Sequence, residues 1–285
     1  MIERFAKLPR SLAERARTVR LSPDRVRGAV GGVEPGIPAL MAHPDWITPV
    51  PTVIWLHGRT AYKEMDSGRY LRWIKAGMAG VAIDLPGHGE RKDKRAESAA
   101  HSLDVLAELV AEIDLVVEAL ADPIWQGVFD LDRLAIGGMS MGGMATLRRL
   151  CDAHEFRCAA VEATTGDLGR LYAEDGPRPW GTWYSPEKIA PLDPAQHLGG
   201  FRPIPLLSLH SEADRIVPAT IQRGFIGRLR AHYVERGADS AAVEYVTWPE
   251  TGAPEEHIGF GRFSSDAKNA QTEFLRRVLL EGKAG

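Results

Sequence analysis

Short apolar runs of strand length alternate along the chain with longer segments in which apolar residues recur every three or four positions. The short runs predict strands at residues 52–56, 80–84, 133–137, 158–161, 205–210 and 242–247. The longer segments predict helices at residues 64–76, 98–121, 145–150, 218–236 and 265–280. Strands that are apolar throughout and alternate with helices are typical of a mostly parallel central sheet with helices on both faces. The expected fold class is therefore α/β.

The first fifty residues follow a different pattern. Residues 3–17 are predicted to form a short amphipathic helix, which Pro9 interrupts. Glycine and proline then separate β-prone pieces at 18–21, 25–33 and 37–42, which we expect to be antiparallel edge strands of the main sheet. Three prolines predict a loop before the first buried strand: Pro44, Pro49 and Pro51.

Residues 164–203 interrupt the alternation of strands and helices. The segment is much longer than an ordinary connection of about 2–6 residues, and it carries Trp180, Trp183 and Tyr184 among glycine, proline and charged residues. We expect it to form a cap insertion, with these three aromatic residues binding the substrate. The alternative is a surface excursion with a small core of its own. The chain is otherwise predicted to form one domain over residues 1–285, since 44% of its residues are hydrophobic.

Composition and charge exclude several functions. The net charge is −3 and the pI is about 6.3, without the clustered positive charge that nucleic-acid-binding proteins carry. No apolar run reaches the roughly 18 residues that span a bilayer, and the N-terminus lacks the apolar core of a signal peptide. We therefore expect a cytoplasmic protein that binds neither nucleic acid nor membrane and has no metal site. Cys151 and Cys158 could form a disulfide, but free thiols are favoured. The oligomeric state stays open.

Residues 134–150 carry the strongest chemical signal. An apolar run ends in Gly138-x-Ser140-x-Gly142 and passes into a predicted helix. A serine at the apex of a sharp strand–turn–helix exposes its hydroxyl, and small neighbours let the backbone approach other elements closely. Ser140 is therefore the candidate nucleophile. The Met141 N–H, at the start of the helix, is a candidate donor to an oxyanion.

A serine nucleophile needs a base, and the base needs a carboxylate that orients it. On this type of sheet the order along the chain is serine, acid, histidine. Asp214 follows the fifth buried strand and is the expected acid; Glu212 is the reserve, and Asp193 is weaker because it lies inside the insertion. Among the histidines only His257 follows the sixth buried strand, and it is the expected base.

The loop after the first buried strand is expected to supply a second oxyanion donor. Its sequence is His57-Gly58-Arg59, and Gly58 permits a close approach of the backbone. These features assign the second donor to the Arg59 N–H. The Arg59 side chain is expected either to face a substrate carboxylate or to pair with Glu64, and the pairing is slightly favoured.

Taken together, these motifs resemble the α/β-hydrolase superfamily. The resemblance rests on Gly138-x-Ser140-x-Gly142, on His57-Gly58 after a strand, on Asp84-x-Pro86-Gly87-His88-Gly89-Glu90-Arg91, on Asp214 with Val217-Pro218, and on His257. It covers about residues 50–280 and is closest to the branch of dienelactone-hydrolase-like and prolyl-oligopeptidase-like small serine esterases. Dienelactone hydrolases use a cysteine where this chain has Ser140, and oligopeptidases add a large propeller domain that does not fit in 285 residues.

The resemblance implies a serine hydrolase that needs neither a metal nor a cofactor. Ser140, Asp214 and His257 would form its catalytic triad, and the N–H groups of Arg59 and Met141 its oxyanion hole. The expected substrate is a small or medium acyl ester, hydrolysed through an acyl-enzyme. The alternatives are a peptidase or amidase acting on short peptides, a thioesterase, and a catalytically silent binding module with a hydrolase fold.

Overall fold

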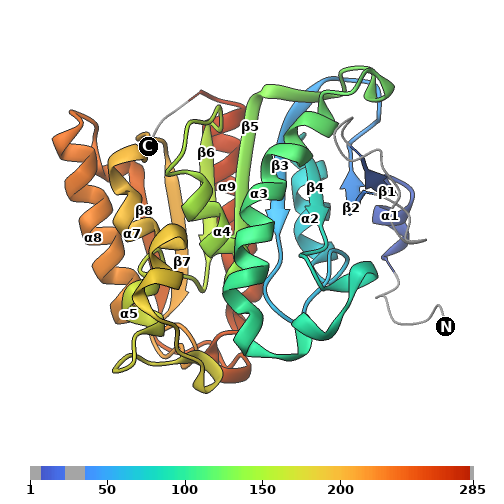
Figure 1. Ribbon diagram of the computed structural model, residues 1–285. Helices are drawn as coiled ribbons and strands as arrows, with labels where there is room; N and C mark the ends of the chain where they lie inside the picture. The colour runs from blue at the N-terminus through green and yellow to red at the C-terminus, as the bar shows by residue number, and fades with distance from the viewer. Residues whose placement is uncertain (1–7, 23–35, 283–285) are drawn as a thin grey trace.

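One eight-stranded sheet organises the computed structural model, which describes residues 8–22 and 36–282 (Figure 1). The strands are β1 Ala16–Leu21, β2 Ile37–Ala42, β3 Val50–Leu56, β4 Ala79–Ile83, β5 Phe129–Met139, β6 Cys158–Glu162, β7 Leu206–Ser211 and β8 Val243–Trp248. Their order across the sheet is β1-β2-β4-β3-β5-β6-β7-β8. Neighbouring strands are parallel from β4 to β8, whereas β1 pairs antiparallel with β2, and β2 with β4. The predicted α/β class is confirmed.

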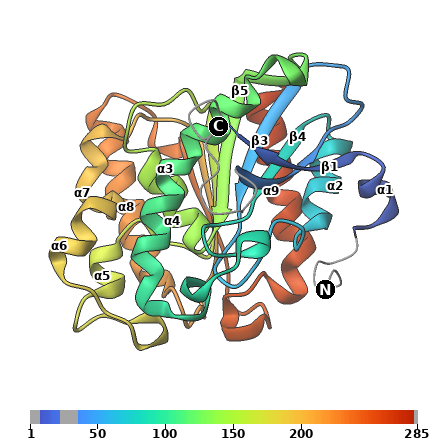
Figure 2. The same ribbon diagram turned by 45° about the vertical axis from the view of Figure 1, so that its right-hand side comes forward.

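Helices cover both faces of this sheet, as Figures 1 and 2 show. The α-helices of the described residues are α1 Arg10–Ala13, α2 Ser67–Lys75, α3 Ser102–Leu120, α4 Met141–Arg149, α5 Leu168–Tyr172, α6 Pro186–Ile189, α7 Pro194–His197, α8 Ala219–Glu235 and α9 Ser264–Leu279. Helices α3, α4 and α8 contribute Leu109, Leu147 and Phe225 to one core. Helices α2 and α9 contribute Trp73 and Phe274 to the core on the other face. Because both faces are covered, the central strands are mostly apolar and largely buried.

The N-terminal helix is shorter than predicted. Of the expected helix 3–17, the described part forms a helix only at Arg10–Ala13, directly after Pro9. A proline fits at the start of a helix, where its missing N–H would have no helical partner in any case. The helix ends early because Ala16 already pairs with β2 as the first residue of β1. Residues 3–7 lie outside the described residues.

The edge strands agree with the prediction as far as they are described. The pieces at 18–21 and 37–42 lie in β1 and β2, which pair with each other in antiparallel register. The predicted strand at 25–33 lies outside the described residues. The edge of the sheet therefore carries the expected antiparallel pair.

Two central strands extend beyond their apolar runs. β3 begins at Val50, so Pro51 lies inside a strand where the sequence predicts a loop. The register between β3 and β5 shifts between Pro51 and Thr52, and such an irregularity accommodates a residue that has no N–H for the ladder. β5 likewise begins at Phe129, before the predicted start at residue 133, because Phe129 pairs with Val50.

The insertion 164–203 folds into the short helices α5, α6 and α7. The Asp193 carboxylate accepts hydrogen bonds from the N–H groups of Leu168 at 2.9 Å and Gly169 at 3.2 Å, and it thereby ties the start of α7 to α5. Ile189 of α6 packs in the same core as α3 and α4. The segment thus shares the main core and does not form a separate one. Its role as a cap over the substrate stays a prediction.

Two further expectations concern the helices and the cysteines. Within the described ranges, every helix is too short or too polar to cross a membrane. Cys151 and Cys158 are both buried free thiols. Burial raises the pKa of each thiol, which keeps both protonated and unreactive at neutral pH.

Candidate active site

Ser140 lies in the sharp turn between β5 and α4. Its backbone has φ 52° and ψ −117°, a conformation that residues other than glycine rarely adopt. Two neighbours hold it there. The Ser140 N–H donates to Glu162 O at 2.8 Å, and Thr164 Oγ1 donates to Ser140 O at 2.7 Å. The strained turn places the serine at the carboxyl edge of the parallel sheet, where functional loops gather.

Two glycines make room for this turn. A Cβ atom on Gly142 would lie 2.1 Å from Leu56 O, and one on Gly138 would lie 2.4 Å from the carbonyl carbon of Gly142. Both distances are far shorter than van der Waals contact, so the backbone of the turn packs directly on the end of β3. The spacing of small residues around Ser140 therefore follows from packing.

The structure brings together three side chains that lie far apart in the sequence. His257 Nε2 is 2.9 Å from Ser140 Oγ, and His257 Nδ1 is 2.8 Å from Asp214 Oδ2. Ser140 and Asp214 are 5% exposed and His257 is 3% exposed. In this arrangement the serine hydroxyl donates to one ring nitrogen while the other ring nitrogen donates to the carboxylate.

The loop after β7 fixes the Asp214 carboxylate. Its Oδ1 accepts hydrogen bonds from the N–H groups of Ile216 and Val217, both at 2.8 Å. Oδ2 is thereby directed toward His257. Backbone N–H groups of this loop thus fix the orientation of the carboxylate independently of its contact with His257.

The two weaker acid candidates are engaged elsewhere. The Glu212 carboxylate forms an ion pair with Arg223, and a third of its side chain is exposed. The Asp193 carboxylate binds N–H groups of the insertion, as described above. Of the three predicted acids, only Asp214 lies against the His257 ring.

The two predicted oxyanion donors belong to α4 and to the loop after β3. Met141 is the first residue of α4, where an N–H group has no partner inside the helix. Gly58 O accepts hydrogen bonds from His57 Nδ1 at 2.7 Å and from Ala61 N at 3.3 Å. Because the carbonyl and the N–H of a trans peptide point in opposite directions, these bonds also fix the direction of the Arg59 N–H.

His57 is a buried, neutral histidine. The Leu85 N–H donates to His57 Nε2 at 3.1 Å, so the ring proton lies on Nδ1 and is donated to Gly58 O. Burial lowers the pKa of His57 to about 4, which keeps the ring neutral at pH 7. A Cβ atom on Gly58 would lie 3.4 Å from Ser140 Cβ. The ring thus orients a peptide group directly beside the nucleophile.

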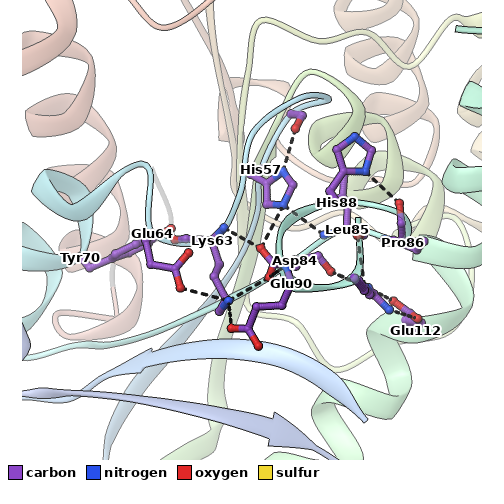
Figure 3. A network of polar contacts seen from close by, with 12 residues as sticks. His57, Lys63, Glu64, Tyr70, Asp84, Leu85, Pro86, His88, Glu90 and Glu112 are labelled. Atoms are coloured by element: carbon purple, nitrogen blue, oxygen red, sulfur yellow. Dashed lines mark hydrogen bonds and ion pairs between the residues drawn. The ribbon is translucent and has the colours of Figure 1, made fainter. Parts of the chain in front are cut away.

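A buried ion cluster behind this peptide joins the loops after β3 and β4 (Figure 3). The Lys63 side chain is fully buried, and its Nζ lies 2.8 Å from Asp84 Oδ2 and 2.5 Å from Glu90 Oε1. A third carboxylate, that of Glu64, lies 3.0 Å from the same nitrogen. Burial alone would lower the pKa of Lys63, but the carboxylates outweigh it and raise that pKa. Because Glu64 pairs with Lys63, the slightly favoured pair of Glu64 with Arg59 is wrong.

The Arg59 side chain is directed toward the insertion. Its Nη1 donates to Ser102 Oγ at 2.8 Å, at the start of α3. Its guanidinium carbon lies 5.3 Å from the centre of the Trp180 ring, within the range of a cation–π contact. The residue whose N–H is a candidate oxyanion donor therefore also contacts the insertion.

The three aromatic residues predicted to bind substrate have different surroundings. Trp180 and Trp183 are 54% and 51% exposed, and they present apolar surface to solvent. Tyr184 is buried, and its hydroxyl donates to Ala99 O at 2.6 Å. Tyr184 thus fastens the insertion to the segment before α3. A contact with substrate stays a prediction for all three residues.

Glu256 gives no signal in the sequence, yet its carboxylate anchors the loop that carries His257. It accepts hydrogen bonds from Thr251 N at 2.6 Å, Thr251 Oγ1 at 2.7 Å and Gly252 N at 2.7 Å. Ser211 Oγ donates a fourth at 2.8 Å. The backbone bond from Thr251 and the other three lower the pKa of Glu256 to about 2. Thr251 and Gly252 belong to the same loop as Glu256, whereas Ser211 is the last residue of β7, so only part of this set lies close in the sequence.

Comparison with known proteins adds a family. The sequence profile of the prolyl oligopeptidase family matches residues 67–281. Esterase YjfP of Escherichia coli K12 is 30% identical over 194 residues, which are 64% of this chain and 77% of YjfP. The putative esterase YitV of Bacillus subtilis 168 is 26% identical over 200 residues, which are 66% of this chain and 77% of YitV. The acylaminoacyl peptidase of Pyrococcus horikoshii superposes with a TM-score of 0.69 at 18% identity, over 95% of this chain and 42% of the peptidase.

These matches cover the part of the chain that carries the candidate site. The family profile spans Ser140, Asp214 and His257 together with α4, α8 and α9. The structural match, at its low identity, shows the shared fold. The resemblance to the α/β-hydrolases, and to their prolyl-oligopeptidase-like branch, is confirmed. The chain is a serine hydrolase that belongs to the prolyl oligopeptidase family of α/β-hydrolases.

Proposed function

We propose that the protein hydrolyses carboxylic esters through an acyl-enzyme, with Ser140 as nucleophile, His257 as general base and acid, and Asp214 as its partner. The observation that carries the proposal is the continuous chain of two hydrogen bonds, 2.9 Å from Ser140 Oγ to His257 Nε2 and 2.8 Å from His257 Nδ1 to Asp214 Oδ2. A serine hydroxyl is a weak nucleophile at neutral pH, and the hydrogen-bonded His257 is the base that activates it.

In the first half of the reaction Ser140 Oγ bonds to the acyl carbon, and its proton passes to His257 Nε2. The negative charge that develops on the carbonyl oxygen is stabilised by the N–H groups of Arg59 and Met141. The bond to the alcohol oxygen then breaks, and His257 returns the proton to the departing alcohol. Asp214 stabilises the imidazolium in between.

In the second half a water molecule takes the place of the alcohol. His257 accepts a proton from the water as its oxygen bonds to the acyl carbon, and the bond from that carbon to Ser140 Oγ breaks. The proton on His257 then passes to Ser140 Oγ, and the acid leaves. Atoms and charge balance with the ester and one water molecule as the reactants.

The esterases YjfP and YitV support an ester in preference to an amide. Peptide hydrolysis is the second candidate, because the family includes peptidases and the triad chemistry is common to both reactions. The match to the acylaminoacyl peptidase of Pyrococcus horikoshii covers 42% of that protein's length.

Turnover of p-nitrophenyl acetate and of an alanine p-nitroanilide distinguishes the two reactions. We expect kcat/KM for the ester to exceed that for the anilide by roughly 100-fold or more, and Ser140→Ala to abolish both. The Ser11→Ala variant, at an exposed serine of α1 outside the site, serves as the matched control. A higher kcat/KM on the anilide would replace the esterase assignment by a peptidase one.

A further inference from the structure

A cavity of about 210 Å³ opens beside the nucleophile, on the side of the sheet that α2 and α9 cover. Its wall includes Met139, which precedes Ser140, and Ile258 and Gly259, which follow His257. Gly58, which also lines it, lies against Ser140. Sequence neighbours of both Ser140 and His257 therefore form part of the cavity wall, and the proposed mechanism leaves the cavity without a role.

Most of the wall is apolar or aromatic. Trp55, Tyr62, Met65, Tyr70 and Phe260 contribute to it, and Met65 is 54% exposed. Such a lining binds apolar groups by removing their surface from water. Apolar ligand groups therefore gain the most binding free energy from entering this cavity.

The charged side chains in the wall neutralise one another. Arg69 donates to Glu162 Oε1 at 2.7 Å and to Asp66 Oδ2 at 2.6 Å, and Lys268 Nζ lies 3.0 Å from Asp66 Oδ1. Two cations and two carboxylates therefore face the cavity in paired contacts. A charged ligand would gain no unpaired partner from these four groups, so the chemistry favours a neutral one.

The volume limits the ligand to a single ring. An apolar cavity of roughly 150 Å³ holds benzene, and about 210 Å³ leaves room for one six-membered ring with a short link to the reacting centre. A second fused ring would extend beyond the cavity into solvent.

The position relative to His257 identifies which part of an ester enters. The departing alcohol receives its proton from His257 Nε2, so its oxygen must lie within hydrogen-bond reach of that nitrogen. Residues that directly follow His257 form part of the cavity wall. This position favours the alcohol side of the ester as the part that enters the cavity.

We propose that this cavity, lined by Trp55, Tyr62, Met65, Tyr70 and Phe260, binds the alcohol part of the substrate and selects esters of neutral alcohols that carry one apolar ring. The inference rests on the proposed ester hydrolysis and deepens it by naming the alcohol class.

Acetate esters of different alcohols test the proposal, because every acetate gives the same acyl-enzyme and differs only in the alcohol. We expect kcat/KM for cyclohexylmethyl acetate to exceed that for ethyl acetate by roughly tenfold or more, since burial of the ring adds to binding. The two-ring decahydronaphthylmethyl acetate is expected to gain nothing further. Equal values for ethyl and cyclohexylmethyl acetate would overturn the proposal.

A variant that narrows the cavity provides a second test of the proposal. Met65→Trp is expected to reduce the ratio of cyclohexylmethyl to ethyl acetate at least about fivefold. The ratio of ethyl cyclohexanecarboxylate to ethyl acetate, which reports the acyl side, is expected to stay within about twofold. Ile124→Trp, at a 72% exposed site outside the cavity, is the matched control and should leave both ratios unchanged.

The outcomes separate the two proposals. If Met65→Trp changes the acyl ratio and not the alcohol ratio, or leaves both ratios unchanged, the assignment of the cavity is overturned while ester hydrolysis stands. Failure of the wild-type protein to hydrolyse any of these esters overturns the proposed function, and this inference with it.

Discussion

Each member of the Ser140–His257–Asp214 chain is held by contacts of its own. Hydrogen bonds to the backbone fix Ser140 in a strained conformation and orient the Asp214 carboxylate. His257 follows Glu256, whose carboxylate accepts four hydrogen bonds. Such support keeps reacting groups within a few tenths of an ångström of a productive geometry, which is what catalysis by positioning requires.

Asp214→Asn tests the role of the carboxylate at this scale. The amide preserves the shape of the side chain but no longer stabilises the imidazolium, and its NH₂ group favours the wrong tautomer of His257. We expect kcat/KM for p-nitrophenyl acetate to fall by roughly 10³–10⁴-fold. Glu212→Gln, at the nearby acid that pairs with Arg223, is the matched control and should change kcat/KM less than about twofold. A larger loss in Glu212→Gln than in Asp214→Asn would exchange the two assignments.

Glu256→Gln tests the anchor of the histidine loop. The folded-state pKa of Glu256, about 2, lies below its ordinary value of 4.5. The carboxylate therefore contributes stability above pH 4.5, and that contribution is lost as the pH falls toward 2. Urea unfolding should show wild type more stable than Glu256→Gln at pH 6, with the difference narrowing between about pH 5 and pH 3.

Glu255→Gln is the matched control for this measurement. Its carboxylate is 56% exposed and lies 3.9 Å from Arg215, so we expect a stability change within about 0.5 kcal/mol. A difference between wild type and Glu256→Gln that stays constant from pH 6 to pH 3 would contradict the account of the loop.

At the scale of elements, the site depends on close contact between the β5–α4 turn and the end of β3. Leu56 O leaves no space for a side chain on Gly142. The loops after β3 and β4 are in turn joined through Lys63, whose buried ammonium contacts Asp84 and Glu90. Removal of one partner from such a cluster leaves an uncompensated buried charge. Movement of the two loops apart would have the same cost, so their relative position is fixed.

Gly142→Ala tests this contact. The new Cβ would lie 2.1 Å from Leu56 O, so strand or turn must shift. We expect the free energy of unfolding to fall by about 3 kcal/mol or more, together with a loss of activity. Gly227→Ala in α8, where a Cβ would meet nothing within 4 Å, is the matched control and should stabilise the protein by about 0.5–1 kcal/mol. Equal stability of Gly142→Ala and wild type would contradict the packing described here.

At the scale of the whole molecule, the sequence predicts the sheet and the order of the site residues because both follow from local patterns. Buried strands are mostly apolar, and the motif around Ser140 marks a turn whose predicted partners follow later strands. The contacts of Lys63 with Asp84 and of Glu256 with Ser211 escape prediction, since each joins residues that only folding brings together. The position of Pro51 inside a strand is also not predicted. A register shift between β3 and β5 accommodates this residue, which has no N–H for the ladder.

The large-scale arrangement also explains why Ser140 and His257, 117 residues apart in sequence, meet at one edge. Parallel strands direct all their carboxyl-end loops to the same side of the sheet. The insertion 164–203 begins at that side and reaches the site through Trp180, which lies beside Arg59. Ser140 is thereby held in a preorganised setting that suits a nucleophile.

Labelling with a fluorophosphonate probe tests that claim most directly. The intact mass of the wild-type protein should increase by one phosphonyl group, and peptide mapping should place it on Ser140. Ser140→Ala should stay unlabelled, and Ser208→Ala, at a buried serine of β7, should label like wild type. An unmodified wild-type protein, or equal labelling of Ser140→Ala, would contradict the account.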